Sequence, residues 1–202
     1  MAKLYFYYAS MNAGKSTNLL QADFNYRERG MGTMLFTAAV HDRAGFGVID
    51  SRIGLKAAAH AYRADTDFRE AIAAELELRR VDCVLVDEAQ FLSRRQVLQL
   101  AAACDDLGIP VLAYGLRTDF QGQLFEGSGA LLALADSLTE LKAVCECGRK
   151  ATMNLRVDGE GRAVRSGAQT EVGGNERYVS LCRRHFTQRL AAAEQAPLPF
   201  EA

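Results

Sequence analysis

Short, mainly apolar segments recur along the first 141 residues of the chain, separated by longer stretches of mixed polarity. Cys83–Val86 contains no polar position, which is typical of a strand that is buried on both faces of a sheet. Leu4–Tyr8 is apolar and aromatic, as β-strands commonly are. The strands that this pattern predicts are Leu4–Tyr8, Met34–Thr37, Cys83–Val86, Ile109–Tyr114 and Leu138–Leu141.

The longer stretches carry apolar residues at helical spacing and predict helices over Lys15–Arg29, Asp67–Arg80, Ser93–Leu107, Gly127–Ala135 and Phe186–Glu194. Ser93 is a suitable N-cap for the third helix, and Gly108 is a suitable stop signal. The buried face of the first helix is expected to contain Leu19, Leu20, Phe24 and Arg27. That of the second is expected to contain Phe68, Ile72, Leu76 and Leu78.

This alternation of strands and helices predicts an α/β domain, a parallel sheet with helices on both faces, over residues 1–141. Residues 142–185 differ, because they hold three of the five cysteines, six glycines and no long apolar run. Such a segment cannot form a stable hydrophobic core by itself and needs an additional cross-link to hold it together. We therefore expect a second, small subdomain over residues 142–194 and a loose tail over residues 195–202.

Composition narrows the class of protein. The chain has 202 residues and a net charge of −1, so its overall charge does not favour a general DNA-coating role. No apolar run reaches the roughly 20 residues that span a bilayer, and the N-terminus lacks a signal-peptide pattern, so we expect a cytoplasmic protein. Without export, five cysteines indicate metal ligands or buried thiols. Cys83, in a core strand, and Cys104, late in a helix, fit buried thiols.

A phosphate-binding turn follows the first strand. The P-loop pattern G-x-x-x-x-G-K-[ST] is present except that Ala9 replaces its first glycine. Backbone N–H groups at the following helix N-terminus would cradle phosphate oxygens, while Lys15 bridges the β- and γ-phosphates and Ser16 binds Mg²⁺. The alternative is a chance match at a helix start. The residues expected to bind the nucleotide are Ala9, Ser10, Met11, Asn12, Ala13, Gly14, Lys15 and Ser16.

Two carboxylates end the buried strand Cys83–Val86. Asp87 would hold Mg²⁺ in a P-loop enzyme. Glu88 is then placed to accept a proton from a nucleophile, either water in an ATPase or a substrate hydroxyl in a kinase. The alternative is a solvated acidic cap on a strand.

Three cysteines and a histidine form two pairs in the C-terminal region. Cys145 and Cys147 are two residues apart, and Cys182 and His185 are three apart. Residues i and i+2 of an extended segment share a face, as do i and i+3 of a helical turn. The two pairs can therefore close a tetrahedral Cys₃His zinc site. The alternative is free thiols beside a surface histidine.

These motifs together resemble those of thymidine kinases of the zinc-containing type, a family that bacteria share with the cytosolic animal enzyme. The resemblance covers nearly the whole chain and rests on Ala9–Thr17, Asp87–Phe91, Tyr114–Phe120, Gly173–Gly174 with Tyr178, and the Cys145, Cys147, Cys182, His185 set. It implies a P-loop domain of the RecA-like type and a zinc-ribbon subdomain. It also implies transfer of the ATP γ-phosphoryl group to the 5′-hydroxyl of thymidine, a homotetramer, and feedback inhibition by thymidine triphosphate.

The resemblance also implies roles for individual residues. Glu88 is the proton acceptor, and the nucleotide is bordered by Asp87, Glu88, Ala89 and Gln90. Asp50 and Arg52 resemble the family's D-x-R element, which contacts phosphate. The cofactors implied are ATP with Mg²⁺ and a structural Zn²⁺. Family members commonly carry glycine at the position of Ala9 and C-x-x-C where this chain has Cys145-Glu-Cys147.

Loop aromatics and a glycine-rich stretch are expected to bind the nucleoside. The residues expected there are Met11, Leu116, Phe120, Phe125, Gln169, Thr170, Glu171, Val172, Gly173 and Tyr178. In the family, residues matching Met11 and Leu116 lie near the thymine methyl group, and the Gln169–Gly173 stretch resembles a lasso loop that folds over the base. The alternatives are aromatics that only anchor loops and a loop that is simply flexible.

Two other functions fit part of the pattern. A P-loop ATPase could use a zinc ribbon to contact nucleic acid, and seven basic residues of the C-terminal region could serve it: Arg149, Lys150, Arg156, Arg162, Arg165, Arg183 and Arg184. A nucleotide-sensing module would use ATP binding as a switch, although the Asp87–Glu88 pair points to catalysis. We expect thymidine as partner, and neither nucleic acid nor membrane.

Overall fold

The computed structural model describes residues 1–39, 47–170 and 177–195. Its elements are β1 (Leu4–Ala9), α1 (Lys15–Glu28), β2 (Thr33–Ala38), β3 (Val48–Asp50), β4 (Lys56–Ala58), β5 (His60–Tyr62), α2 (Phe68–Leu78), β6 (Cys83–Val86), η1 (Ala89–Phe91), α3 (Arg94–Leu107), β7 (Val111–Leu116), α4 (Glu126–Leu134), β8 (Ser137–Glu140), β9 (Ala143–Val144), β10 (Lys150–Ala151), β11 (Met153–Arg156), β12 (Tyr178–Leu181) and α5 (Arg183–Gln195).

The chain divides into two compact units. The sheet unit comprises Met1–Ala9, Gly14–Arg117 and Leu124–Leu141. The cysteine unit comprises Ser10–Ala13, Thr118–Gln123 and Lys142–Ala202. The domain ranges 1–141, 142–194 and 195–202 expected from the sequence stay a prediction.

A six-stranded sheet with the order β5-β2-β6-β7-β1-β8 is the centre of the sheet unit, and each neighbouring pair is parallel. The five strands and five helices predicted from the sequence are all present, with ends that differ by a few residues. The short strands β3, β4 and β5 were not predicted. β3 and β4 form a separate antiparallel hairpin, and β5 extends the main sheet beside β2.

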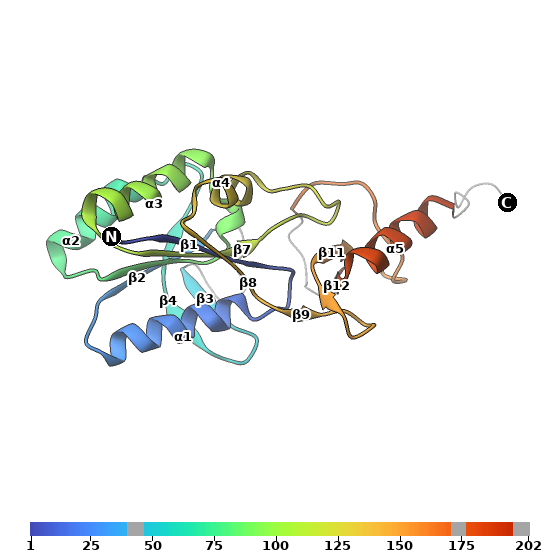
Figure 1. The fold of residues 1–202 in the computed structure, drawn as a ribbon, viewed down its shortest axis with the longest axis horizontal. Coiled ribbons are helices and arrows are strands. Elements are labelled where there is room, and N and C mark those ends of the chain that lie inside the picture. Colours follow the sequence, from blue (N-terminus) through green and yellow to red (C-terminus); the bar gives the residue numbers. More distant parts are fainter. Residues whose placement is uncertain (40–46, 171–176, 196–202) are drawn as a thin grey trace. The chain divides into compact units, whose positions relative to one another are not determined.

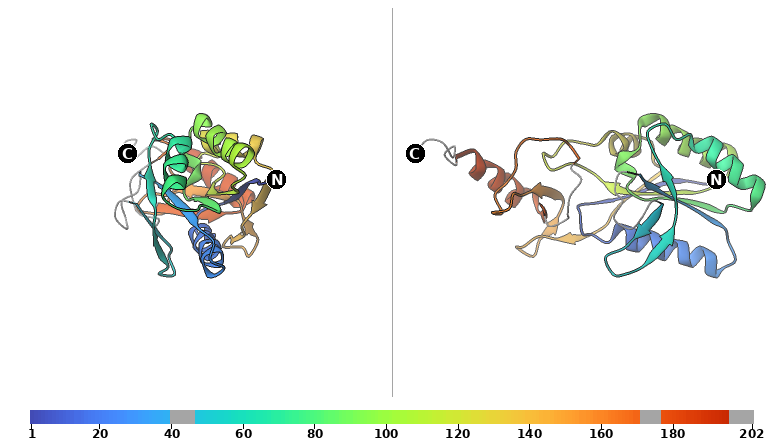
Figure 2. Two further views of the ribbon diagram at one scale, coloured as in Figure 1. Left: turned by 90° about the vertical axis from the view of Figure 1, so that its left-hand side faces the viewer. Right: turned by 180° about the vertical axis from the view of Figure 1, so that it is seen from behind.

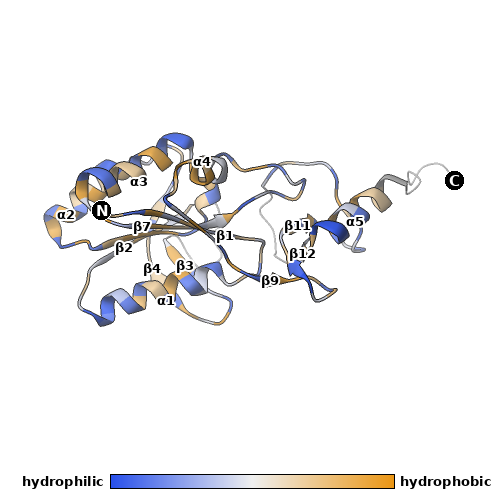
Figure 3. Ribbon diagram, viewed as in Figure 1, coloured by the Kyte–Doolittle hydropathy of each residue, from blue (hydrophilic) through white to orange (hydrophobic). Residues whose placement is uncertain are grey.

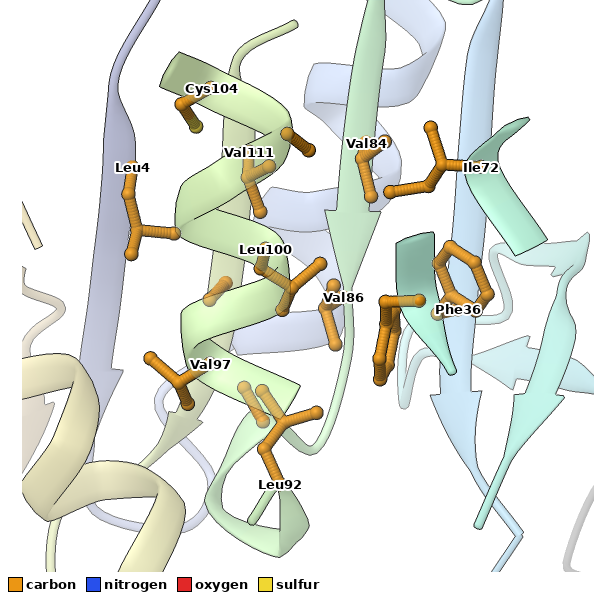
Figure 4. Packing of buried hydrophobic residues seen from close by; sticks show 14 of the residues in the cluster. Leu4, Phe36, Ile72, Val84, Val86, Leu92, Val97, Leu100, Cys104 and Val111 are labelled. Atoms are coloured by element: carbon orange, nitrogen blue, oxygen red, sulfur yellow. The ribbon is translucent and has the colours of Figure 1, made fainter. Parts of the chain in front are cut away.

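Helices cover both faces of this sheet, as Figure 1 and the view from behind in Figure 2 show for α1 on one side and α2, α3 and α4 on the other. Successive residues of the strands belong to different cores. Val84 and Val86 lie in the cluster with α2, α3 and α4, whereas Cys83 and Leu85 lie in the cluster with α1. Figure 4 shows Val84 and Val86 among the apolar side chains of the larger cluster. A strand without polar positions is what a sheet covered on both faces requires.

The predicted buried face of α1 was wrong at Phe24, which is 59% exposed, and at Arg27, whose side chain is 56% exposed. Asp23 takes the buried position instead. Its carboxylate accepts a hydrogen bond from Thr33 Oγ1 and lies 2.9 Å from Arg27 Nε, so its burial is compensated. On α2, Phe68 and Ile72 are buried as predicted, but Leu76 and Leu78, in the last turn of the helix, are exposed.

The ends of α3 agree with the sequence signals. Ser93 and Gln96 form a capping box at its N-terminus. Gly108 follows the last turn in the left-handed conformation and ends the helix.

The cysteine unit has a small core of its own. Two antiparallel strand pairs, β9–β10 and β11–β12, and the helix α5 surround a cluster that includes Leu155, Leu181 and Phe186. Figure 3 colours the strands of the central sheet as more hydrophobic than most of α5. The small size of this core agrees with the expectation that the C-terminal region needs an additional cross-link to hold it together. In the described ranges, no helix is long and apolar enough to cross a membrane.

Candidate active site and metal centre

The turn between β1 and α1 ends at a glycine with a left-handed backbone. Gly14 is the N-cap of α1 and has φ of 75° and ψ of 28°, a left-handed conformation that glycine adopts at little cost. Lys15 is the first residue of the helix. Burial lowers the pKa of the Lys15 ammonium group, and the carboxylates of Glu88 and Asp87 oppose this effect. The Lys15 ammonium group is therefore close enough to the two acidic residues that follow β6 for their charges to act on it.

Ser16 and Asp87 meet at this point. Ser16 Oγ donates a hydrogen bond of 2.8 Å to Asp87 Oδ2, and Asp87 is only 4% exposed. Burial and the neighbouring Glu88 raise the pKa of the Asp87 carboxyl group. A hydroxyl and a buried carboxylate are hard oxygen donors, and a cation would offset the cost of the buried charge. The pair fits Mg²⁺.

Glu88 has an unusual backbone for a residue with a side chain. Its φ is 55° and its ψ is 37°, a conformation that costs about 1–3 kcal/mol in residues other than glycine. Three contacts hold it there. Its N–H donates to Asp87 Oδ1 at 3.0 Å, its carbonyl accepts from the Tyr62 hydroxyl at 2.8 Å, and its Oε2 accepts from Gln90 Nε2 at 2.6 Å. Such over-determined strain is typical of functional sites.

Gln90 connects Glu88 to the sheet. Besides donating to Glu88, it accepts a hydrogen bond from the Leu116 N–H at 3.0 Å through Oε1. Gly115 makes this approach possible, because a Cβ at this position would lie 2.9 Å from Gln90 N and 3.0 Å from its Oε1. The carboxylate of Glu88 is thus fixed by a buried amide that is itself fixed to β7.

The D-x-R residues lie at and after the end of the hairpin strand β3. Asp50 pairs with Lys56 of β4 at 3.0 Å. The guanidinium of Arg52 lies near enough to Lys15 to contribute to lowering the pKa of its ammonium group. The structure therefore brings Arg52 toward the phosphate-binding turn and pairs Asp50 with a lysine of its own hairpin.

The remaining residues of the turn, Ser10–Ala13, belong to the cysteine unit. The Met11 N–H donates to Asn154 Oδ1 at 2.7 Å, and the Met11 carbonyl accepts from Ser180 Oγ at 2.7 Å. Asn154 also donates to the carbonyl of Thr118 at 3.2 Å. The sequence analysis did not single out Asn154 or Ser180, because polar residues in short strands carry no distinctive pattern.

The aromatic residues expected to contact the nucleoside gather around a buried arginine. The guanidinium carbon of Arg156 lies 3.8 Å from the centroid of the Phe120 ring and 5.4 Å from that of Tyr178. Phe120 is buried, and Tyr178 is half-buried. Gln169 Nε2 donates to Asp119 Oδ2 at 3.0 Å, which ties the start of the expected lasso loop to the segment that carries Phe120.

The four predicted metal ligands form a compact cluster. Their donor atoms all lie within 4.8 Å of one another. Cys147 Sγ is 3.9 Å from Cys182 Sγ, and Cys145 Sγ is 3.4 Å from His185 Nδ1. Zinc–sulfur bonds of about 2.3 Å in a tetrahedron place sulfur atoms about 3.8 Å apart, so the donor set fits Zn²⁺.

The local backbone prepares this cluster for a cation. Burial opposes ionisation of Cys145, but the backbone N–H groups of Cys147 and Cys182 and the His185 side chain outweigh it and lower the pKa of the Cys145 thiol. The other two cysteines are buried elsewhere, as predicted. Burial raises the pKa of the Cys83 thiol to about 12 and that of Cys104 to about 11, which keeps both as inert thiols.

Comparison with known proteins decides the family. The sequence profile described as thymidine kinase matches residues 2–186. The chain belongs to the thymidine kinase family. A thymidine kinase from Novosphingobium aromaticivorans is 71% identical over 94% of this chain and 99% of its own. Those from Zymomonas mobilis and Vibrio vulnificus are 64% and 57% identical over 94% of this chain and 98% and 99% of theirs. A solved DNA replication initiation factor covers 70% of this chain and 40% of its own at 18% identity, with a TM-score of 0.38, which establishes no common fold.

Within this thymidine kinase family member, two of the expected nucleoside contacts lie in the sheet unit. Leu116 ends β7, and its carbonyl accepts a hydrogen bond from Ser128 Oγ. Phe125 precedes α4, is buried, and packs edge-on against Phe91 with ring centroids 5.9 Å apart. That packing is what an aromatic loop anchor would show, and a role for Phe125 in nucleoside binding stays a prediction.

Other expected contacts fall partly beyond what the structure describes. Gln169 is exposed and Thr170 is half-buried. Glu171, Val172 and Gly173 lie outside the described residues.

Proposed function

We propose that this protein is a thymidine kinase, which transfers the γ-phosphoryl group of ATP to the 5′-hydroxyl of thymidine and yields thymidine monophosphate. The observation that carries the proposal is the family match over residues 2–186, together with identities of 57–71% to proteins named thymidine kinase. Deoxyuridine, which lacks only the methyl group of thymine, is expected to be a weaker substrate.

The phosphate chain of ATP binds at the turn before α1. The N–H groups at the helix N-terminus face the phosphate oxygens, and the ammonium group of Lys15 supplies a positive charge. The positive charge of Arg52, which acts on Lys15, would also attract a phosphate group bound at this turn. Ser16 and Asp87 would hold Mg²⁺, which would supply positive charge to neutralise the phosphate oxygens.

Glu88 accepts the proton of the attacking hydroxyl. Its carboxylate is supported by Gln90 and its backbone by Tyr62, so the acceptor is oriented before the substrate arrives. Phosphoryl transfer depends mainly on positioning and on electrostatic stabilisation. A preorganised acceptor beside the metal-binding carboxylate serves both requirements.

The nucleoside binds to residues of the cysteine unit. Phe120, Tyr178 and Met11, all in this unit, are the side chains that line the base in this proposal, and the backbone of the Gln169–Gly173 stretch reads the base edge. A structural Zn²⁺ held by the Cys₃His cluster fixes the ends of this segment and takes no part in the chemistry.

The wider biology follows from the family. We propose a cytoplasmic enzyme of nucleotide salvage that assembles as a homotetramer and is inhibited by thymidine triphosphate, without nucleic acid or membrane as a partner.

The test is ADP release from ATP with Mg²⁺, measured with thymidine, with single-stranded DNA and with neither. We expect release only with thymidine, in step with the formation of thymidine 5′-monophosphate. Release that DNA stimulates, without a phosphorylated nucleoside, would establish instead the P-loop ATPase that acts on nucleic acid.

A further inference from the structure

Arg156 is the largest fully buried side chain among the described residues and is 2% exposed. A guanidinium group stays charged in proteins, so burying it in a small core costs free energy unless hydrogen bonds and other favourable contacts compensate its charge. The catalytic scheme above does not use Arg156. Its position in β11, directly across from Tyr178 of β12, puts it among the residues proposed to bind the nucleoside.

Three segments of the cysteine unit meet on this one side chain. The guanidinium lies over the ring of Phe120, 3.8 Å from its centroid. Nε donates to the hydroxyl of Tyr178 at 3.0 Å. Nη2 donates to the carbonyl of Ala168 at 2.9 Å, one residue before Gln169. The planar guanidinium thus fixes both aromatic rings and the start of the expected lasso loop.

The fit around the guanidinium is tight. Gly167 has φ of 138°, and a Cβ at that position would lie 3.2 Å from Arg156 Nη1. The chain after Gly167 can therefore approach the guanidinium closely enough for the Ala168 carbonyl to accept its hydrogen bond. Lysine could keep the charge, but it offers neither a flat face for Phe120 nor a planar fork of donors.

We propose that Arg156 is a positioning residue for nucleoside selection: it sets the placement of Phe120, Tyr178 and the loop at Ala168 and has no part in phosphate binding. The inference rests on the proposed function. This role would explain why a cation is buried beside the residues proposed to bind the base. Its cation–π contact and its hydrogen bonds hold the side chains and the backbone of the binding site in fixed positions.

The test compares R156M, R156K and Y178F with the control R162M. Methionine keeps the unbranched bulk of the arginine stem without its donors or its charge. Arg162 is an exposed arginine of the same unit that pairs with Asp158. Steady-state kinetics with thymidine and with ATP are measured on zinc-loaded protein, together with zinc content and thermal midpoint.

For R156M we expect the KM for thymidine to rise about tenfold, with the KM for ATP and kcat within about threefold of wild type. The preference for thymidine over deoxycytidine should fall as well. R156K should show the same rise in the KM for thymidine with little change in the KM for ATP or in kcat. The control R162M should have wild-type values of all three. In a double-mutant cycle, Y178F should add little to R156M, because the arginine acts partly through that hydroxyl.

Wild-type affinity for thymidine in R156M, or a KM for ATP that rises as much as that for thymidine, would overturn the inference. If R156M does not bind zinc, the KM of R156K for thymidine is the deciding measurement. A wild-type value in R156K would also overturn the inference. A wild-type protein that fails to phosphorylate thymidine would instead overturn the proposed function and the inference with it.

Discussion

Glu88 is the residue on which the proposed chemistry depends most. It has a left-handed backbone, follows directly on the buried Asp87 and receives a hydrogen bond from Gln90. A surface glutamate that only capped a strand would lack the contacts that offset the free-energy cost of this conformation. In the proposed mechanism, this arrangement keeps the proton acceptor in place beside the carboxylate proposed to bind Mg²⁺, and phosphoryl transfer depends mainly on such positioning.

Glu88→Gln tests this role, because it keeps the shape of the side chain and removes its basicity. We expect kcat to fall by roughly 10²–10⁴ while the dissociation constant for thymidine changes little. Rapid-quench turnover and equilibrium binding measure the two quantities. Glu77→Gln changes an exposed glutamate of α2 and is the matched control. Near-normal turnover in Glu88→Gln would place the base elsewhere.

At the level of single elements, the sequence predicted the strands and helices of the main sheet well. Strands covered on both faces and helices with marked ends, such as α3 after Ser93, carry strong local signals. The strands β3, β4 and β5 are only three residues long each, which is too short for a periodic hydrophobic pattern to be recognised. Phe24 was misplaced because the helical pattern does not show that Thr33, in the next strand, donates a hydrogen bond to Asp23 and so allows a carboxylate to occupy the buried face.

The start of α2 gives a prediction about pH. Asp67 caps this helix through Oδ1, and Oδ2 accepts from Arg95 and Gln99 of α3 at 2.8 Å and 2.6 Å. The backbone N–H of Glu70 and the guanidinium of Arg95 lower the pKa of the Asp67 carboxyl group. Its stabilising effect is therefore present above the unfolded pKa of about 3.9 and is lost as the pH falls through the lower folded value.

Asp67→Asn keeps a capping oxygen but removes the charge. We expect a lower thermal midpoint than wild type at pH 7 and a gap that narrows as the pH falls below about 4. Differential scanning fluorimetry across this range measures it. Asp65→Asn, an exposed aspartate two residues earlier, should change the midpoint little at any of these pH values. A gap that is independent of pH would show that the charge of Asp67 contributes nothing.

On the scale of the whole molecule, the cysteine unit contains more of the expected site than sequence reasoning could assign. The spacing of Cys145, Cys147, Cys182 and His185 predicted that these four side chains would come together, because the two members of each pair share a face. No pattern of that kind marks Asn154 or Arg156. Their importance comes from contacts with Met11, Phe120 and Tyr178, distant in sequence, that only the folded chain brings together.

Removal of the metal tests this organisation. Structural zinc sites contribute roughly 10–16 kcal/mol to the folding of their modules, so Cys182→Ser should lose zinc and disorder the cysteine unit while the parallel sheet stays folded. Thymidine binding should be abolished. ATP binding should weaken less, since Met11 loses the support of Asn154 and Ser180 but Gly14 and Lys15 stay in the sheet unit.

Elemental analysis, calorimetry with each ligand and far-ultraviolet circular dichroism measure these effects. We expect about one zinc per chain in the wild type. Cys104→Ser, at a buried thiol of α3 outside the cluster, is the control and should keep its zinc. A Cys182→Ser protein with full zinc content or unchanged thymidine binding would contradict the proposed role of the cluster.

The comparison of kcat/KM for thymidine, deoxyuridine, deoxycytidine and deoxyguanosine tests the central claim most directly. The methyl group of thymine adds roughly 1 kcal/mol of apolar contact, so deoxyuridine should be modestly poorer. Deoxycytidine presents a donor where thymidine presents an acceptor, and a backbone N–H left unpaired costs roughly 1–3 kcal/mol, so its deficit should be larger. Deoxyguanosine should be too large for a site closed by Phe120 and Tyr178. Thymidine as the best substrate, in that order of decline, is the result we predict, and efficient phosphorylation of deoxycytidine or deoxyguanosine would contradict it.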